Sequence, residues 1–301
     1  MRLSVLICTY NREKYVYNVL RSVALNTFPR NNYEIILVDN NCTDNTVGEC
    51  ERFCNDFPDI TFRRVVEKNQ GLSYARNRAI AEASGEILVY VDDDALVNDD
   101  FLQAYDDIFN MMPEAMGAGG QVQPLYETEE PTWMSHYTKV LITSYKYDGD
   151  KIKENKCGKF PSGGNMGFRR EVFEKVGAFN PELGRKGKNL IGAEEKDFND
   201  RMQKAQLKTF YIPRAILYHI ISPVRFTKEY FVNLTYSIGK SERNRTLSIS
   251  KGKFIKRLFL ECVKWGGTLV LWCGFLLKFQ PQKGNKLIFF RYNVTKGLLG
   301  F

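Results

Sequence analysis

The first half of the chain alternates between short apolar runs and longer polar stretches. The apolar runs are Leu3–Cys8, Glu34–Val38, Ile60–Val66 and Ile87–Val91. Runs of this length predict buried strands, and the segments Lys14–Leu25 and Ser73–Ser84 between them place apolar residues at helical spacing. Strand, helix, strand, helix is typical of a parallel sheet covered by helices, so we expect an α/β fold of Rossmann-like type.

The second half is less regular. It contains two glycine-rich segments, at 117–120 and 163–167. Helical patterns follow at Glu171–Val176 and Glu194–Ala205, and a strand-like run follows at Ala215–Ile221. After residue 225 the pattern is helical. We find no internal repeat.

Composition excludes several protein classes. The 301 residues are 44% hydrophobic and 26% charged, ordinary values for a globular chain of one large domain or two joined ones. None of the seven cysteines forms a Cys-x-x-Cys pair, and only two histidines are present. We therefore expect neither a zinc site nor a disulfide scaffold, and a reducing compartment. The cysteines are Cys8, Cys42, Cys50, Cys54, Cys157, Cys262 and Cys273.

The positive charge is concentrated at the C-terminal end. Residues 251–301 contain ten Lys or Arg and one acid, Glu261, so their net charge is +9. Since the whole chain has a net charge of +8, the other 250 residues sum to −1. This asymmetry predicts an anionic partner, either a membrane or a nucleic acid. The uncharged stretch Trp265–Leu277 has 13 residues, short of the roughly 20 that span a bilayer, which favours a helix in the membrane interface. The alternative is a solvated basic helix packed on the rest of the chain.

The N-terminus predicts a strand. Its apolar run of about six residues is too short for the hydrophobic region of a signal peptide, so we expect a cytoplasmic protein. With the basic end, this predicts a peripheral position on the inner face of the plasma membrane.

Carboxylates follow one of the predicted strands directly. Asp92, Asp93 and Asp94 come after the run ILVYV. Three adjacent carboxylates repel one another unless a cation neutralises them, and such oxygen ligands suit Mg²⁺ or Mn²⁺. In parallel sheets, ligands bind beyond the carboxyl ends of the strands. The alternative is a solvated acidic loop.

Two further loops contain candidate binding residues. Asp39 ends the run EIILV, where its carboxylate can accept hydrogen bonds from a nucleobase or ribose; the alternative is an Asx turn. Arg76 lies in NQGLSYARN, a glycine turn that enters a helix, and we expect it to point towards the strand ends. The alternative is a surface arginine on a capped helix.

These segments together resemble the motifs of family 2 glycosyltransferases. SVLICTYNR, ILVDNNCTDNT, NQGLSYARN and VYVDDDA occur in the order that the family has, followed by FPSGGNMGFRR, EVFEKVGAF, GAEEKDFNDR and IPRAILYH. The resemblance covers about residues 3–245. It implies a GT-A fold in residues 1–225, with a nucleotide-binding half to about 115 and an acceptor-binding half over 116–225. Residues 226–301 would then form a helical, basic, membrane-associated region.

The resemblance also implies a role for individual residues. The nucleotide pocket would be lined by Thr9, Tyr10, Arg12, Asp39, Asn41 and Arg76, with Asp39 contacting the base, usually uracil. Asp92 and Asp94 match the ends of the family's Asp-x-Asp motif, with Asp93 as the variable middle residue. Asp94 would bind the divalent cation, Mn²⁺ or Mg²⁺, together with Asp92 and His219. Gly163, Gly164 and Asn165 would let the backbone approach the donor sugar or diphosphate.

The catalytic base is expected at a pair of acids. The family has Glu-Asp where this chain has Glu194 and Glu195, so Glu195 takes the matching place and Glu194 is the alternative. A carboxylate there would take the proton of the acceptor hydroxyl. As an isolated pattern, the segment is also an acidic first helical turn.

The resemblance implies an inverting glycosyltransferase of polysaccharide biosynthesis. Its donor would be a nucleotide sugar, with UDP as the expected nucleotide, and its acceptor a hydroxyl group of a glycan or lipid-linked glycan. One alternative is a nucleotidyltransferase, but CTYNREK lacks the glycines of a triphosphate-binding loop. The other is a basic nucleic-acid-binding protein, which the near-neutral body disfavours. We expect no nucleic acid partner.

Overall fold

The contacts divide the chain into two compact units. The computed structural model describes residues 1–156, 158–187 and 192–301. The α/β unit comprises Met1–Leu125, Ser144–Pro181 and Glu194–Ile220, and the helical unit comprises Tyr126–Thr143, Glu182–Ala193 and Ile221–Phe301. This division differs from the sequence-based boundary at 225 by assigning residues 126–143 to the helical unit, because their side chains pack there.

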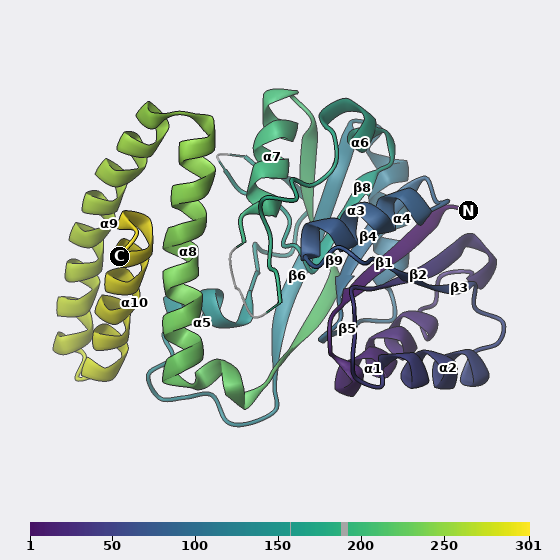
Figure 1. Ribbon diagram of the computed structural model, residues 1–301, viewed down its shortest axis with the longest axis horizontal. Coiled ribbons are helices and arrows are strands. Elements are labelled where there is room, and N and C mark those ends of the chain that lie inside the picture. Colours follow the sequence, from purple (N-terminus) through teal and green to yellow (C-terminus); the bar gives the residue numbers. More distant parts are fainter. Residues whose placement is uncertain (157, 188–191) are drawn as a thin grey trace. The chain divides into compact units, whose positions relative to one another are not determined.

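The α/β unit is built on a mixed sheet with the strand order β3-β2-β1-β4-β8-β6-β9-β5, and β7 pairs with β9 (Figure 1). The predicted parallel sheet is confirmed for β1 (Leu3–Thr9), β2 (Tyr33–Asp39), β3 (Phe62–Val66) and β4 (Ile87–Asp92). The pairings of β8 with β4 and of β9 with β5 are antiparallel. The remaining strands are β5 (Ala95–Val97), β6 (Ala115–Tyr126), β7 (Lys153–Glu154), β8 (Asn165–Arg169) and β9 (Lys208–Ile221).

Helices cover both faces of this sheet. The helices α1 (Glu13–Ala24), α2 (Thr46–Asp56) and α4 (Phe101–Met111) contribute to one apolar core, and α3 (Leu72–Glu82), α6 (Glu171–Val176) and α7 (Glu194–Lys204) contribute to the other. Successive strand residues alternate between the two cores, as Val5 and Ile7 lie in the first and Leu6 in the second. Side chains on both sides of every central strand are therefore buried, which explains the continuous apolar runs in the sequence.

The strand register brings distant polar residues to one edge of the sheet. Thr9 pairs with Asp39, and Cys8 pairs with Asp92, so the carboxyl ends of β1, β2 and β4 meet. On the antiparallel side, the β5–β9 pairing sets Ala95 opposite His219. The edge therefore gathers side chains from both halves of the α/β unit.

The helical unit contains α5 (His136–Thr143), α8 (Lys228–Ile249), α9 (Lys251–Leu277) and α10 (Pro281–Leu299). Its apolar core is formed by Met134, Ile142, Phe231 and Leu234. The hydroxyl of Ser250 accepts a hydrogen bond from the Lys253 amide, so it caps the N-terminus of α9 and marks its boundary with α8. Short 3₁₀ helices lie at Arg30–Asn32 and Pro223–Phe226.

Six of the seven cysteines lie in the part of the chain that the structure describes. These six are free thiols, and Cys157 lies outside the residues that the structure describes.

Candidate active site

The acidic loop after β4 and a histidine of β9 form a possible cation site. One ligand atom from each of Asp92, Asp94 and His219 lies within 4.8 Å of the others. Nε2 of His219 is 3.3 Å from Oδ1 of Asp94, and the Ile220 amide donates to the Asp94 carbonyl at 2.8 Å. Two carboxylates and an imidazole are suitable ligands for a divalent ion such as Mn²⁺.

The electrostatics of the loop also fit a cation. Burial, followed by the charge of Asp94, raises the pKa of Asp92 and raises that of Asp93 to about 7. These carboxylates therefore destabilise one another when ionised, and a cation would relieve that repulsion.

The N-terminal motif lies beside this loop. Nη2 of Arg12 is 3.7 Å from Oδ2 of Asp94. The Thr9 hydroxyl oxygen is buried and makes no hydrogen bond within the described part of the chain, so it is an unsatisfied polar atom at the strand edge. The Tyr10 side chain is exposed. All three residues therefore lie at or just after the carboxyl end of β1, and their contact with a nucleotide stays a prediction.

Asp39 forms a second polar group at the end of β2. Its Oδ1 accepts a hydrogen bond from the Cys42 amide at 2.8 Å, and its Oδ2 accepts one from Nη1 of Arg64 at 2.6 Å. The amide lies three residues along the chain rather than two, so this bond closes the loop after β2 and is not the Asx turn considered for the sequence. Asn41 has a positive φ of 66° and donates from Nδ2 to the Lys68 carbonyl at 2.8 Å, so it fixes the loop that follows β3.

Arg76 is buried and pairs with both candidate bases. Its Nη1 is 2.9 Å from Oε1 of Glu194, and its Nη2 is 3.1 Å from Oε1 of Glu195. Burial alone would lower the pKa of Arg76, but the charges of Glu195 and Glu194 outweigh it and raise that pKa. The alternative of a surface arginine is wrong, because this guanidinium lies inside the α/β unit.

Gly163 and Gly164 make room for these acids. A Cβ atom on Gly163 would lie 1.6 Å from Oε1 of Glu195, and one on Gly164 would lie 2.2 Å from Oδ2 of Asp92. Any side chain would clash with the carboxylates. The two glycines therefore connect the candidate base to the candidate cation site through adjacent backbone positions.

Asn165 is buried within the same turn. It accepts a hydrogen bond from the Tyr105 hydroxyl and donates two, to the carbonyls of Gln121 and Ala215. Its side chain therefore joins β8 to the neighbouring strands, and its predicted contact with the donor stays a prediction.

Sequence reasoning missed three residues of this region. Arg64 pairs with Asp39, and Asn40 accepts the Gly71 amide and donates to the carbonyls of Glu67 and Asn69. Asn40 could have been found from the sequence, because it directly follows the strand end at Asp39.

The third is Lys146. Its Nζ donates to the Phe160 carbonyl at 2.5 Å. Burial lowers the pKa of Lys146 to about 8, and the charges of Asp148 and Glu195 partly oppose that change. No sequence motif marks this lysine.

The family comparison identifies the class of protein. A model described as glycosyl transferase family 2 matches residues 4–177. The chain belongs to glycosyltransferase family 2. As a member of that family it is an enzyme that transfers a sugar from a nucleotide sugar, so the alternatives of a nucleotidyltransferase and of a non-enzymatic nucleic-acid-binding protein are wrong.

Curated relatives of this family-2 enzyme use more than one acceptor. A glucosyl-dolichyl phosphate glucuronosyltransferase of Haloferax volcanii is 26% identical over 273 residues, which cover 87% of this chain and 85% of the relative. A poly(ribitol-phosphate) β-N-acetylglucosaminyltransferase of Staphylococcus aureus is 27% identical over 151 residues, or 48% of this chain and 26% of that protein. The second match thus spans about a quarter of its relative.

Solved structures confirm the GT-A-like fold of the family-2 enzyme. A mannosyltransferase of Pyrobaculum calidifontis, solved with GDP-Man and Mn²⁺, gives a TM-score of 0.64 at 17% identity over 99% of this chain and 87% of that one. The S. aureus enzyme TarS, residues 1–349 with UDP-GlcNAc, gives a TM-score of 0.53 at 17% identity over 100% of this chain and 92% of that one.

Proposed function

We propose that this enzyme transfers a sugar from a UDP-sugar to a hydroxyl group of a lipid-linked glycan, with inversion at the anomeric carbon and Glu195 as the base. The observation that carries the proposal is the close packing of Gly163 and Gly164 against Glu195 and Asp92. A base and a cation site that pack against adjacent backbone positions suit a reaction that joins an acceptor to a diphosphate-linked sugar.

Exposure favours Glu195 over Glu194 as the base. The Glu195 side chain is 29% exposed, whereas that of Glu194 is 4% exposed. A base must reach the hydroxyl whose proton it takes. Arg76 contacts Oε1 of Glu195, which orients the carboxylate and leaves Oε2 for the acceptor. Glu194 then serves as the buried counter-ion of Arg76.

The donor end of the site would use β1, β2 and β4. The paired Asp39 and Arg64 offer an acceptor and a donor, which complement the N–H and carbonyl groups of a uracil edge. Thr9, Tyr10 and Arg12 would contact the rest of the nucleotide. Structures of TarS with UDP and with UDP-GlcNAc support a UDP-linked donor.

The diphosphate would lie at the acidic loop. Asp92, Asp94 and His219 would hold a divalent ion, Mn²⁺ or Mg²⁺, as the ligand set supports. Such an ion neutralises the negative charge of the departing diphosphate.

The names of the relatives favour a lipid-linked acceptor. The Haloferax relative and a Methanococcus voltae relative that covers 84% of this chain both act on dolichyl-phosphate-linked sugars by name. The poly(ribitol-phosphate) enzyme matches only 48%. A lipid-linked acceptor places the enzyme at a membrane, and we propose a peripheral position on its cytoplasmic face.

Calorimetry of UDP binding tests the donor. We expect UDP to bind the wild type with Mn²⁺, and Asp94→Ala to abolish that binding. Binding of GDP in place of UDP would refute the base assignment alone. If neither nucleotide binds with Mn²⁺ or Mg²⁺, the proposed site is wrong.

Turnover of bound donor tests the base. Glu195→Gln should bind UDP normally and lose transfer by at least a hundredfold, whereas Glu194→Gln, the matched control, should keep more of its activity. An NMR assignment of the product linkage checks inversion, and retained configuration would exclude a single-base mechanism.

A further inference from the structure

The polarity of α9 is inverted relative to an ordinary surface helix. Its buried residues are Arg257, Glu261 and Thr268. Large apolar side chains instead face outward, among them Ile255, Phe259, Val263, Val270 and Leu277, which are 58–82% exposed. A surface helix normally buries its apolar stripe, so the outer face of α9 requires an apolar environment other than the protein core.

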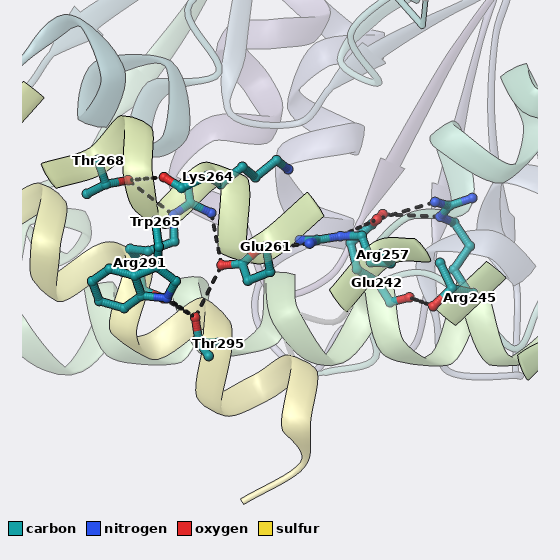
Figure 2. A network of polar contacts seen from close by, with 10 residues as sticks. Glu242, Arg245, Arg257, Glu261, Lys264, Trp265, Thr268, Arg291 and Thr295 are labelled. Carbon is teal, nitrogen blue, oxygen red and sulfur yellow. Dashed lines mark hydrogen bonds and ion pairs between the residues drawn. The ribbon is translucent and has the colours of Figure 1, made fainter. Parts of the chain in front are cut away.

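A network of charges holds this orientation (Figure 2). Glu261 on α9 pairs with Arg257 at 2.8 Å and with Arg291 of α10 at 3.1 Å, and Arg257 reaches Glu242 of α8 at 3.2 Å. Burial alone would raise the pKa of Glu261, but the two arginines outweigh it and lower that pKa. Turning α9 over would break these buried pairs, so the apolar face is fixed outward.

An apolar pocket adjoins that face. It lies between α9 and α10, has a volume of about 590 Å³, and is lined by residues that include Trp265, Leu269, Trp272 and Ile288. Both indole N–H groups are satisfied, by Thr295 and Asn285, so the rings present apolar walls. The volume is in the range of pockets that hold small ligands.

We propose that the outer face of α9 and this pocket form a membrane-docking surface that lies in the plane of an anionic bilayer, with a lipid acyl chain in the pocket. The occupant follows from charge, because the exposed lysines of α9 and its C-cap, Lys251, Lys253, Lys256, Lys264 and Lys278, have no acidic counterpart on that helix other than the buried Glu261, and basic residues near anionic lipid attract it. An apolar helix face flanked by Lys and Arg is the pattern of helices in the interface. The inference adds an orientation and a lipid site to the membrane location proposed above.

The neighbours of α9 favour this orientation over a transmembrane one. By length and hydropathy α9 is a candidate span, because it has 27 residues and contains an 18-residue segment with a mean hydropathy of 1.3. However, Arg291 and Thr295 bind α10 to Glu261 of α9, so α10 would have to enter the bilayer with it. α10 also contains Lys283, Lys286 and Lys296. In the hydrocarbon these cations are strongly disfavoured, whereas in the interface Lys283 and Lys296 can stay near water while Lys286 remains over the Trp133 and Phe231 rings of the helical unit.

Vesicle flotation of the full chain tests the surface. We expect binding to vesicles of phosphatidylcholine with 30% phosphatidylglycerol, and at least tenfold weaker binding to phosphatidylcholine alone. Phe259→Asp and Val270→Asp should each lower binding to anionic vesicles at least tenfold. Met111→Asp is the matched control, because Met111 is 63% exposed on α4 of the α/β unit. It should bind as the wild type does.

The same variants separate this proposal from the proposed function. Transfer to a water-soluble acceptor analogue should be unchanged in Phe259→Asp and Val270→Asp, because neither residue belongs to the site. Unchanged vesicle binding in these variants would refute the docking surface. A concentration-dependent dimer that both variants dissociate, without vesicle binding, would instead assign the face to a second copy and also refute it.

Tryptophan depth tests the orientation. Trp133→Phe combined with Trp272→Phe leaves only Trp265, and Trp133→Phe with Trp265→Phe leaves only Trp272. The two positions are about 10 Å apart along the helix axis. Quenching by brominated lipids should place both at the same shallow depth. A difference of about 10 Å would show a spanning helix, and quenching of neither would exclude lipid in the pocket.

Discussion

Replacing Arg76 by methionine would test how the acids of the site are held. Methionine keeps an unbranched side chain of similar length but removes the guanidinium that pairs with Glu194 and Glu195. The Arg76 and Glu194 side chains are 3% and 4% exposed and lie 2.9 Å apart. The variant therefore leaves the Glu194 carboxylate buried without the arginine that neutralises it.

The expected loss of stability is large. Removing one partner of a buried ion pair costs about 3–5 kcal/mol, because the remaining charge is poorly solvated. For a folding unit of this size, 1 kcal/mol lowers the melting temperature by roughly 2–4 °C, so we expect a decrease of roughly 6–20 °C. Calorimetry of Arg76→Met against the wild type measures it.

A second substitution identifies the charge responsible. Adding Glu194→Gln to Arg76→Met should recover most of the loss, because glutamine has no charge to bury. Adding Glu195→Gln is the matched control and should recover less, since that carboxylate is 29% exposed and partly solvated. The reasoning would be refuted if Arg76→Met lost less than about 1 kcal/mol, or if Glu195→Gln restored more stability than Glu194→Gln.

The remaining predictions concern acid stability and the two glycines. Burial acts to raise the pKa of Glu34, but hydrogen bonds from two serines and an arginine outweigh it and lower that pKa from 4.5, so its contribution to stability is present above about pH 4.5 and is lost as pH falls. Glu34→Gln should therefore unfold at a lower temperature than the wild type at pH 7, with a smaller difference at pH 3; equal differences at the two pH values would contradict this. Gly164→Ala should displace Asp92 and weaken Mn²⁺ binding at least fivefold by calorimetry, as its added Cβ would lie 2.2 Å from the carboxylate. Gly163→Ala should lower the transfer rate by displacing Glu195 while Mn²⁺ binding persists, and the opposite pattern in the two variants would contradict the packing argument.

The first strands and the acidic edge could be predicted because both depend on local patterns. Buried parallel strands are continuous apolar runs, and the first polar residue after each run marks its carboxyl end. Asp39 and Asp92 were found in this way, and the parallel register then brings them to one edge.

β6 could not be predicted, because its glycines disfavour a strand. The reason for them is tertiary, since a Cβ on Gly117 would meet the Phe168 ring at 2.7 Å and one on Gly120 would meet the Ala215 carbonyl oxygen at 1.8 Å. The sequence does not reveal which neighbouring strand comes this close.

The side-chain partners of the site were equally hidden. Arg76 and Glu194 are 118 residues apart, and the family resemblance implied a nucleotide contact for Arg76 rather than an ion pair with the acids. On α9, composition indicated a basic, partly apolar helix, but it does not reveal that Arg257 and Glu261 are buried. Their burial depends on Arg291 of α10 and Glu242 of α8.

The pairing of β5 with β9 has a consequence for synthesis of the chain. His219 follows Asp94 by 125 residues, so at about 5–20 residues per second the ribosome produces the acidic loop roughly 6–25 seconds before its imidazole partner. During that interval β9 is missing, and the loop has neither its antiparallel neighbour nor its third ligand. The three carboxylates then repel one another and keep the loop hydrated. The complete set of two carboxylates and an imidazole therefore forms only once β9 has been made and has paired with β5.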